Sequence, residues 1–393
     1  MSRDSKLKSL ALLVVSLLVA FGAAEVGLRL GGVKFDASLY GNDAVTGWRL
    51  RPHAQGWWTT ENVSYVRLNS FGGHDREYSL AKPPNTVRVA VLGDSMTAAV
   101  QVEIPQTFAS VLQQRLAGCP AFGQQNVEVM NFGVPGFGTA QELLQFRHYV
   151  RPYDPDIVIL AFFTYNDVHN NHRALNPVAA DSAPYFVLRD NQLVLDDSFR
   201  RRGSSYGWLR DRLADAVNRS RVAQLVAEGL IRHGLFRLTR PREEAIQERF
   251  GGDMGTLMHA APKTPEMQEA WQVTEGVILQ LAREVEQAGA RFWLVTLLEG
   301  TQGLPPAERA REVERRRIED LYYSDRRLER FATSHGLRVL NLADQVAALP
   351  AHPGKPLTFG NGSGHYTPEG HLLIGTLIAG RICSPSAGSR DSR

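Results

Sequence analysis

The chain alternates short, fully apolar stretches with stretches of helical periodicity, and this alternation constrains its fold more than any other feature. Buried strands are expected at residues 87–92, 127–130, 157–163, 291–297 and 337–342. Helices are expected at residues 107–116, 140–149, 265–287, 322–334 and 368–382. Five strands separated by helices predict an α/β fold in which a parallel sheet is covered by helices on both faces.

The alternation stops between about residues 168 and 264, where a hairpin at 185–195 and a helical pattern at 208–238 are expected. We interpret this region as a cap inserted into an α/β domain that extends over residues 85–383. Residues 40–84 are rich in Gly, Trp, Asn and Pro, and we expect residues 31–84 to form a neck with one hairpin near residues 63–68. The Ser/Gly/Arg tail, residues 384–393, is expected to be disordered.

The first thirty residues have the composition of an export signal. Arg3, Lys6 and Lys8 precede an uncharged apolar run from Ser9 to Ala24. That run alone is short for a membrane of ~30 Å at ~1.5 Å per residue, but a helix that continues to Leu30 is long enough to cross. Small residues at 22–24 leave a cleaved signal peptide as the alternative. We favour a retained transmembrane anchor over residues 1–30, with the basic flank inside and the domain outside the cytoplasm.

The net charge of +3, from 44 basic and 41 acidic side chains, does not indicate nucleic acid as the main partner. Positive charge is nevertheless concentrated in residues 200–242, which contain eleven arginines and only three acidic residues, Asp211, Asp215 and Glu228. A solvated helix face is the ordinary explanation of such a region. Contact with anionic lipid headgroups or an acidic glycan is the alternative if the domain is tethered near a membrane.

Polar residues follow several of the expected strands at the edge where parallel sheets bind ligands. Ser95 comes directly after the first strand, in Gly93-Asp94-Ser95, and acts there either as a nucleophile or as a helix cap. Gly133 follows the second strand and offers a backbone N–H, while Asn166 follows the third and offers a side-chain amide. His365 precedes the last helix, so its imidazole is expected at the same edge.

Together these blocks resemble the SGNH hydrolases, also called GDSL-type esterases. The family's serine in a GDS turn, glycine, asparagine and C-terminal histidine match Ser95, Gly133, Asn166 and His365. The apolar N-terminal segment and the sequence Asn69-Ser70-Phe71-Gly72 resemble its membrane-anchored bacterial branch. The resemblance implies a flavodoxin-like three-layer α/β/α sandwich, ester hydrolysis, and no metal or other cofactor. It also implies a single-pass protein of the cell inner membrane with a periplasmic catalytic domain.

The implied chemistry is acyl transfer. Ser95 attacks an ester carbonyl, His365 takes and returns the proton, and the oxyanion is held by Ser95 N–H, Gly133 N–H and Asn166. Asp94 and Asp167 are expected to be turn residues that make hydrogen bonds behind the site. The expected substrate is an ester of a glycan, a lipid or a small alcohol, and no nucleic acid takes part.

The chain departs from the family pattern in two respects. Thr164 stands where the third block usually has glycine, and Gly362 and Ser363 occupy the positions where the family places the aspartate that orients its histidine. We therefore expect a Ser95–His365 dyad whose Nδ1 is held by a backbone carbonyl or by a distant carboxylate from the cap. The missing acid keeps two alternatives open besides a serine esterase. One is an O-acetyltransferase or deacetylase of a surface polysaccharide, and the other is a catalytically impaired scaffold that binds glycan or lipid.

The remaining histidines and the two cysteines have simpler expected roles. His169 and His172 are interpreted as polar loop residues and not as metal ligands, and His371 as a surface or capping residue of the last helix. Cys119 follows the first helix and Cys383 follows the last. If the sheet is flavodoxin-like, these helices lie side by side and end at the same edge, so a disulfide is possible, with two separate thiols as the alternative.

Overall fold

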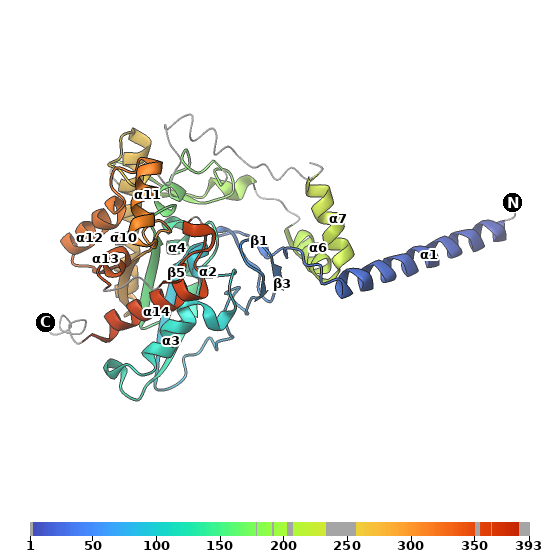
Figure 1. Ribbon diagram of the computed structural model, residues 1–393, viewed down its shortest axis with the longest axis horizontal. Coiled ribbons are helices and arrows are strands. Elements are labelled where there is room, and N and C mark those ends of the chain that lie inside the picture. Colours follow the sequence, from blue (N-terminus) through green and yellow to red (C-terminus); the bar gives the residue numbers. More distant parts are fainter. Residues whose placement is uncertain are drawn as a thin grey trace.

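The computed structural model describes residues 3–177, 179–190, 192–202, 207–232, 257–349, 354–362 and 364–384. Its centre is a parallel sheet with the strand order β11-β10-β7-β5-β6 (Figure 1). The strands are β5 (Thr86–Gly93), β6 (Asn126–Asn131), β7 (Ile157–Phe163), β10 (Arg291–Leu297) and β11 (Arg338–Asn341). Counted along the chain among themselves, they lie in the order 2-1-3-4-5, which is the flavodoxin-like arrangement. The expected fold class is confirmed.

Helices cover both faces of the sheet, as the fully apolar strands require. One face packs against α4 (Thr139–Gln145), α10 (Pro265–Gln287) and α12 (Tyr323–Ser334), and the other against α3 (Phe108–Leu116), α13 (Leu342–Ala347) and α14 (Pro368–Cys383). Strand β5 shows the alternation that divides the two cores. Ala90 and Leu92 face the first layer, and Val89 and Val91 face the second.

Three further features differ from the elements expected from the sequence. Helix α11 (Pro306–Arg316) was not expected, and none of its residues is buried, in keeping with a sequence made mostly of Glu and Arg. The helix expected over 140–149 is α4 followed by a single π-helical turn at Phe146–Val150. Two short helices, α2 (Ser95–Ala98) and α5 (Asp167–Asn170), begin directly at the strand ends that carry the candidate site.

The neck contains two antiparallel strand pairs where one hairpin was expected. They are β1 (Tyr40–Asp43) with β2 (Gly47–Leu50), and β3 (Gln55–Trp58) with β4 (Ser64–Arg67). Leu39 and Val66 of the neck are buried in one cluster with Ala98 of α2 and Val134 of the loop after β6, at the carboxyl edge of the sheet. The neck therefore packs directly onto the edge of the domain where the site is expected.

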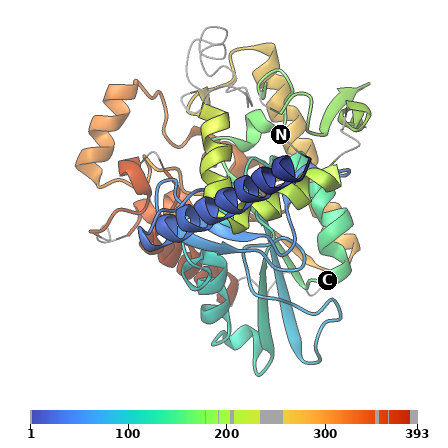
Figure 2. The ribbon, with the colours of Figure 1, turned by 90° about the vertical axis from the view of Figure 1, so that its right-hand side faces the viewer.

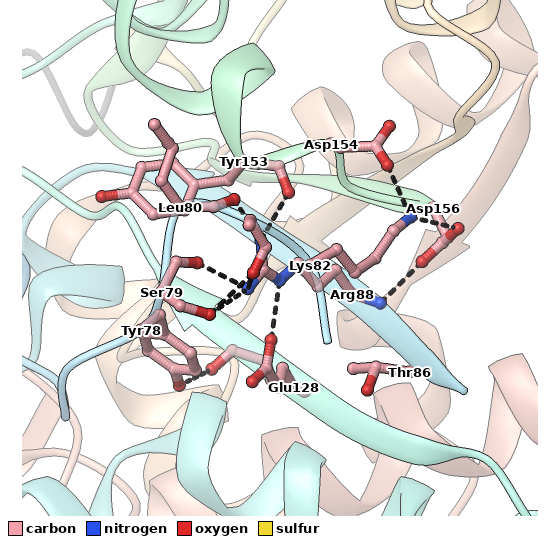
Figure 3. A network of polar contacts seen from close by, with 12 residues as sticks. Tyr78, Ser79, Leu80, Lys82, Thr86, Arg88, Glu128, Tyr153, Asp154 and Asp156 are labelled. Carbon is pink, nitrogen blue, oxygen red and sulfur yellow. Dashed lines mark hydrogen bonds and ion pairs between the residues drawn. The ribbon is translucent and has the colours of Figure 1, made fainter. Parts of the chain in front are cut away.

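A buried arginine connects the end of the neck to the amino edge of the sheet, which is the edge opposite the expected site. Arg88 of β5 is fully buried, and its guanidinium donates hydrogen bonds to Glu128 at 2.7 Å and to the carbonyl oxygens of Leu80 and Tyr153 at 2.9 and 2.8 Å (Figure 3). Its backbone N–H donates to Asp156, which also pairs with the nearby Lys82. A buried guanidinium is stable only when its donors are satisfied in this way.

The N-terminal helix α1 (Arg3–Leu30) projects away from the sheet domain (Figures 1 and 2). The most apolar part of its segment Ser5–Leu30 has a mean hydropathy of 2.3, and none of that part is buried. Helix α1 is therefore long and apolar enough to cross a membrane or to be a signal sequence.

The insertion after residue 168 begins with the hairpin β8 (Tyr185–Arg189) and β9 (Gln192–Asp196), as expected. Helices α6 (Gly207–Arg219) and α7 (Arg221–Arg232) then lie between α1 and the neck (Figure 1). The end of the expected helical pattern, residues 233–238, and the C-terminal tail from residue 385 lie outside the described residues.

Cys119 and Cys383 form a disulfide in the structure, with their Cα atoms 5.6 Å apart. Cys119 lies just beyond α3, and Cys383 is the last residue of α14. Helices α3 and α14 pack closely against each other. At Gly375 of α14 an added Cβ would lie 2.7 Å from the Phe108 carbonyl oxygen, so glycine permits the close contact between the two helices.

Candidate active site

Ser95 is placed at the carboxyl edge of the sheet by a tight turn between β5 and α2. Asp94 caps α2, because its Oδ1 accepts the Met96 N–H at 2.9 Å. Gly93 leaves no room for a side chain, since an added Cβ would lie 2.2 Å from Thr97 Oγ1 and 3.0 Å from the Ala161 carbonyl oxygen. The turn thus brings Ser95 out of the buried strand and into a partly exposed position.

His365 reaches Ser95 from the start of α14. Its Nε2 lies 2.9 Å from Ser95 Oγ, which is hydrogen-bonding distance. The loop before α14 is fixed on both sides of the histidine, because the Phe359 N–H donates to the His365 carbonyl oxygen and Thr367 caps the helix. The expected pairing of a serine with this histidine is present in the structure.

The other nitrogen of the imidazole meets a carboxylate from the neck. Glu61 Oε2 accepts a hydrogen bond from His365 Nδ1 at 2.7 Å, and the His365 backbone N–H points to the same oxygen at 3.3 Å. Partial burial raises the pKa of Glu61, but the hydrogen bond and the charge of His365 outweigh it and hold this pKa below its ordinary value. Ser95, His365 and Glu61 thus form the connected set found in serine hydrolases.

The sequence did not indicate Glu61. A backbone carbonyl or a carboxylate from the cap was expected at Nδ1, and the structure instead supplies a carboxylate from the turn between β3 and β4. Glu61 has a positive φ of 67° within this turn. The neighbouring Asn62 fixes the turn, because its side-chain amide donates to the Gln101 carbonyl oxygen at 2.8 Å. No motif marks this position, since its role depends on how the neck packs onto the sheet.

Asn166 and Asp94 form a pair beside Ser95. Asn166 Nδ2 donates to Asp94 Oδ2 at 2.9 Å, so one of its two amide protons is used and the orientation of the amide is fixed. The second proton is left for another acceptor. Asp94 is fully buried, and this burial raises its pKa. Its place behind the site matches the expected turn role.

The backbone N–H of Gly133 has a different partner from the expected oxyanion. It donates to Asn131 Oδ1 at 2.9 Å, and an added Cβ at Gly133 would lie 2.2 Å from the Ala98 nitrogen. Gly133 therefore allows the loop after β6 to lie against α2, but its N–H is already engaged. Three residues later Gly136 is exposed, has a φ of 81°, and its N–H meets no acceptor among the described residues.

Neck residues also hold the loop after β6 in place. Asp75 Oδ2 accepts the Asn131 N–H at 2.9 Å, and Asn131 Nδ2 donates in turn to the Thr97 carbonyl oxygen of α2 at 2.9 Å. Burial raises the pKa of Asp75 to about 6. The neck is thus linked through Asn131 to the helix that begins with Ser95.

Two further acidic residues lie behind the site. Asp167 accepts the Phe163 N–H at 2.7 Å, so it closes the turn after β7 as expected. Asp167 and Glu142 are both fully buried, and this burial raises both pKa values well above the ordinary range. Repulsion from Asp94 adds to the effect at both residues, and repulsion from Glu142 adds to it at Asp167.

The three other histidines considered in the sequence lie apart from the Ser95–His365 contact. His371 is buried, which corrects the expected surface position. Its Nδ1 accepts the Phe108 N–H at the start of α3, and burial lowers its pKa to about 3. His169 lies in α5, and His172 Nε2 is 3.5 Å from Glu269. Within the described part of the chain no group of three His, Cys, Asp or Glu side chains is suited to a metal ion.

Comparisons with known proteins give similarity only at the level of solved structures. A scan of family models and a search of curated proteins find no match for this chain. The chain is similar to a catalytic mutant of an acetylxylan esterase from Geobacillus stearothermophilus, with 10% identity over 75% of this chain and 94% of that one and a TM-score of 0.37.

Two other solved structures show a similar relationship. A GDSL-like lipase from Bacteroides thetaiotaomicron has 14% identity over 75% of this chain and 87% of that one, with a TM-score of 0.33. A two-domain esterase active on acetylated mannans has 11% identity over 76% of this chain, which spans 49% of that protein, with a TM-score of 0.35. Because these scores are low, we assign the fold from the strand order and from the residues at the carboxyl edge of the sheet. On those features, the chain has a flavodoxin-like α/β/α fold with Ser95, Asn166 and His365 at the carboxyl edge of its sheet.

Proposed function

We propose that the protein is a serine esterase that hydrolyses carboxylic esters through an acyl-enzyme. One observation carries this proposal, the continuous contact from Glu61 to His365 at 2.7 Å and from His365 to Ser95 at 2.9 Å. The absent aspartate had suggested a catalytically impaired scaffold. Glu61 supplies a carboxylate in its place, so that alternative loses the feature on which it rested.

The reaction follows from the positions of these three groups. Ser95 Oγ attacks the ester carbonyl carbon while His365 Nε2 takes its proton. The imidazolium then protonates the departing alkoxide, which leaves as an alcohol, and the acyl group remains bonded to Ser95. A water molecule attacks the acyl-enzyme, gives a proton to His365 and releases the carboxylic acid and the free serine. Glu61 holds the imidazole in the required tautomer and stabilises its positive charge.

The oxyanion of each tetrahedral intermediate needs hydrogen-bond donors near Ser95. We assign this role to the second amide proton of Asn166 and to the Ser95 N–H. The sequence indicated Gly133 as a third donor, but its N–H is engaged by Asn131. The exposed Gly136 N–H in the same loop is our candidate in its place.

We also propose that α1 is a retained anchor and that the domain works outside the cytoplasm. The apolar segment Ser5–Leu30 supports the anchor, and the disulfide between Cys119 and Cys383 is of the kind that persists in oxidising compartments.

The test uses a Ser95→Ala variant and short p-nitrophenyl esters. We expect the wild type to release p-nitrophenol and to be labelled by a fluorophosphonate probe at Ser95, and the variant to do neither. Ser334→Ala, at an exposed serine near the end of α12, is the matched control and should keep full activity. Undiminished hydrolysis by Ser95→Ala would refute the proposal. Acyl transfer to a glycan acceptor in preference to water would identify a transferase with the same nucleophile.

A further inference from the structure

Helix α7 exposes apolar side chains and buries a polar one. Leu225 and Val226 are 48% and 55% exposed, whereas the neighbouring Gln224 is 3% exposed. Leu213 of α6 is 58% exposed. A helix on the surface of a water-soluble domain normally has the reverse pattern. These side chains lie on two helices that pack against each other, which makes this pair of helices a candidate interaction surface.

The same two helices are fixed to the end of α1. The Glu25 carboxylate of α1 accepts the N–H groups of Arg221 and Val222, at 3.1 and 3.0 Å, in the first turn of α7. It also accepts the Ser220 hydroxyl at 3.0 Å, and Arg29 donates to the Arg219 carbonyl oxygen at 2.7 Å. The start of α7 is therefore held at the level of Glu25 along α1.

Further contacts fix α6 to the neck. The Asn218 side chain exchanges two hydrogen bonds with the Ser38 backbone, both at 2.9 Å. The buried guanidinium of Arg51 pairs with Asp215 and donates to the Asp211 carbonyl oxygen at 3.1 Å. Helices α6 and α7 are thus joined both to α1 and to the part of the chain that carries Glu61.

Glu25 marks the end of the apolar run of α1. When α1 crosses a membrane as a helix that continues to Leu30, the uncharged residues Ser9–Ala24 lie in the hydrocarbon and Glu25 lies near its boundary with water on the domain side. Figure 1 shows α7 running crosswise to α1 at this end, and Figure 2, seen from the side of α1, shows the two helices crossing. A helix held crosswise at that level lies along the membrane surface.

We propose that α6 and α7 form a membrane-seating surface, made of Leu213, Leu225 and Val226, that rests in the headgroup region of the leaflet next to Glu25. This inference depends on the proposed anchoring of α1. The exposed side chains of Arg212 and Arg219 support the proposed lipid contact. Cationic side chains beside an apolar surface are typical of a helix that lies among phosphate headgroups. The occupant of the surface is therefore lipid, and the anchor brings it there.

The test places a fluorophore on this surface in the full chain. Val226→Cys, labelled with the environment-sensitive dye NBD, is reconstituted into phosphatidylethanolamine and phosphatidylglycerol vesicles with and without lipids that carry a quenching doxyl group near the headgroup. The two native cysteines are disulfide-bonded and do not react with the dye. Leu372→Cys, at an exposed apolar residue of α14, is the matched control. Retained esterase activity shows that both labelled variants are folded.

We expect a blue-shifted emission at position 226 that doxyl lipid quenches about two-fold or more, and neither effect at position 372. Equal behaviour of the two positions would overturn the proposal. So would a blue shift at 226 without lipid quenching, since a second copy of the chain would then cover the surface. Extraction with alkaline carbonate separates the two hypotheses, because a chain that leaves the membrane refutes the anchor, whereas a retained chain without quenching refutes only the seating surface.

Discussion

Glu61 Oε2 lies 2.7 Å from His365 Nδ1, although 304 positions of the chain separate the two residues. In the proposed mechanism, the carboxylate that orients the imidazole therefore comes from the neck, and the base comes from the start of the last helix. The proposed catalysis depends on a contact between two segments that the sheet topology alone does not bring together.

Replacing Glu61 should lower turnover strongly and substrate binding little. In Glu61→Gln the side chain keeps its size but loses the charge that stabilises the imidazolium, and its amide can favour the wrong tautomer of His365. We expect kcat to fall by ~10²–10⁴ and KM to change little. Ester hydrolysis over a range of substrate concentrations measures both. Glu77→Gln, at an exposed neck carboxylate, is the control. Wild-type turnover in Glu61→Gln would mean that another group orients His365.

Asn166→Ala should remove an oxyanion donor and reduce kcat by ~10²–10³, with the fold intact. Asp94→Asn should also reduce kcat. The carboxylate oxygen that accepts the Asn166 amide proton is replaced by an amide, whose own N–H can face the Asn166 N–H and leave it without an acceptor. Steady-state kinetics and thermal unfolding measure the two effects separately. Asn170→Ala, one turn away in α5, should leave kcat near the wild-type value. An Asn166→Ala variant with full activity would exclude this amide from the oxyanion hole.

Gly133→Ala should lower the stability of the protein as well as its kcat. The added Cβ would lie 2.2 Å from the Ala98 nitrogen and 2.6 Å from the Thr97 carbonyl carbon, so the backbone of α2 must move. We expect a loss of more than about 2 kcal/mol in the free energy of unfolding, measured by denaturant titration. Gly118→Ala is the control, since nothing lies within 4 Å of its added Cβ. If Gly133→Ala unfolds like the wild type and loses only kcat, the glycine acts at the substrate and not in packing.

Removing the disulfide should cost about 2–5 kcal/mol of stability, because Cys119 and Cys383 close a large loop of the chain. The double variant Cys119→Ala, Cys383→Ala should unfold at a lower temperature than the wild type. Dithiothreitol should lower the Tm of the wild type and leave that of the double variant unchanged. Thiol titration of the denatured, unreduced wild type should find no free thiol. Two free thiols in that sample would show that the bond does not form.

Asp325 should make the protein less stable as the pH rises. Burial raises its pKa to about 7, while the unfolded chain releases the same proton near the ordinary value of about 4. Between these values the folded protein binds more protons than the unfolded chain. The contribution of Asp325 to the free energy of unfolding therefore falls from about pH 4 to pH 7, by at most about 1.4 kcal/mol per pH unit.

Asp325→Asn keeps an oxygen for the Gln302 amide, which bonds to Asp325 at 2.7 Å, but it cannot release a proton. The difference in unfolding free energy between the variant and the wild type should therefore grow in favour of the variant between pH 4 and pH 7. Denaturant titrations at several pH values measure this difference. Asp190→Asn, in an exposed hairpin turn, should show the wild-type slope. A difference that stays constant with pH would contradict the raised pKa.

The sheet and part of the site could be predicted from the sequence because they depend on local patterns. Apolar runs define β7 and β10 with their observed bounds, and parallel topology brings the residues that follow the strands to one edge. Ser95, Asn166 and His365 accordingly lie where they were expected. Helix α11 was missed because it is made mostly of Glu and Arg, with only small or single apolar residues at helical spacing.

The rest of the site depends on contacts between distant segments. Glu61 reaches His365 only because Leu39 and Val66 pack beside Val134, and because Asn62 binds the Gln101 carbonyl. The partner of the Gly133 N–H depends on the exact course of one loop. Neither the packing of the neck nor the course of that loop follows from hydrophobic periodicity.

The position of Glu61 in the neck also determines how the protein can be shortened. Truncation at residue 85, where the α/β pattern begins, keeps the whole sheet, Ser95 and His365, yet it deletes the carboxylate at 61 and the Asp75 that holds Asn131. During synthesis from the N-terminus, Ser95 likewise stands without its base until residue 365 has been added. In the proposed mechanism, ester cleavage is thus withheld from every incomplete chain, and the serine becomes reactive only when both distant segments have joined it.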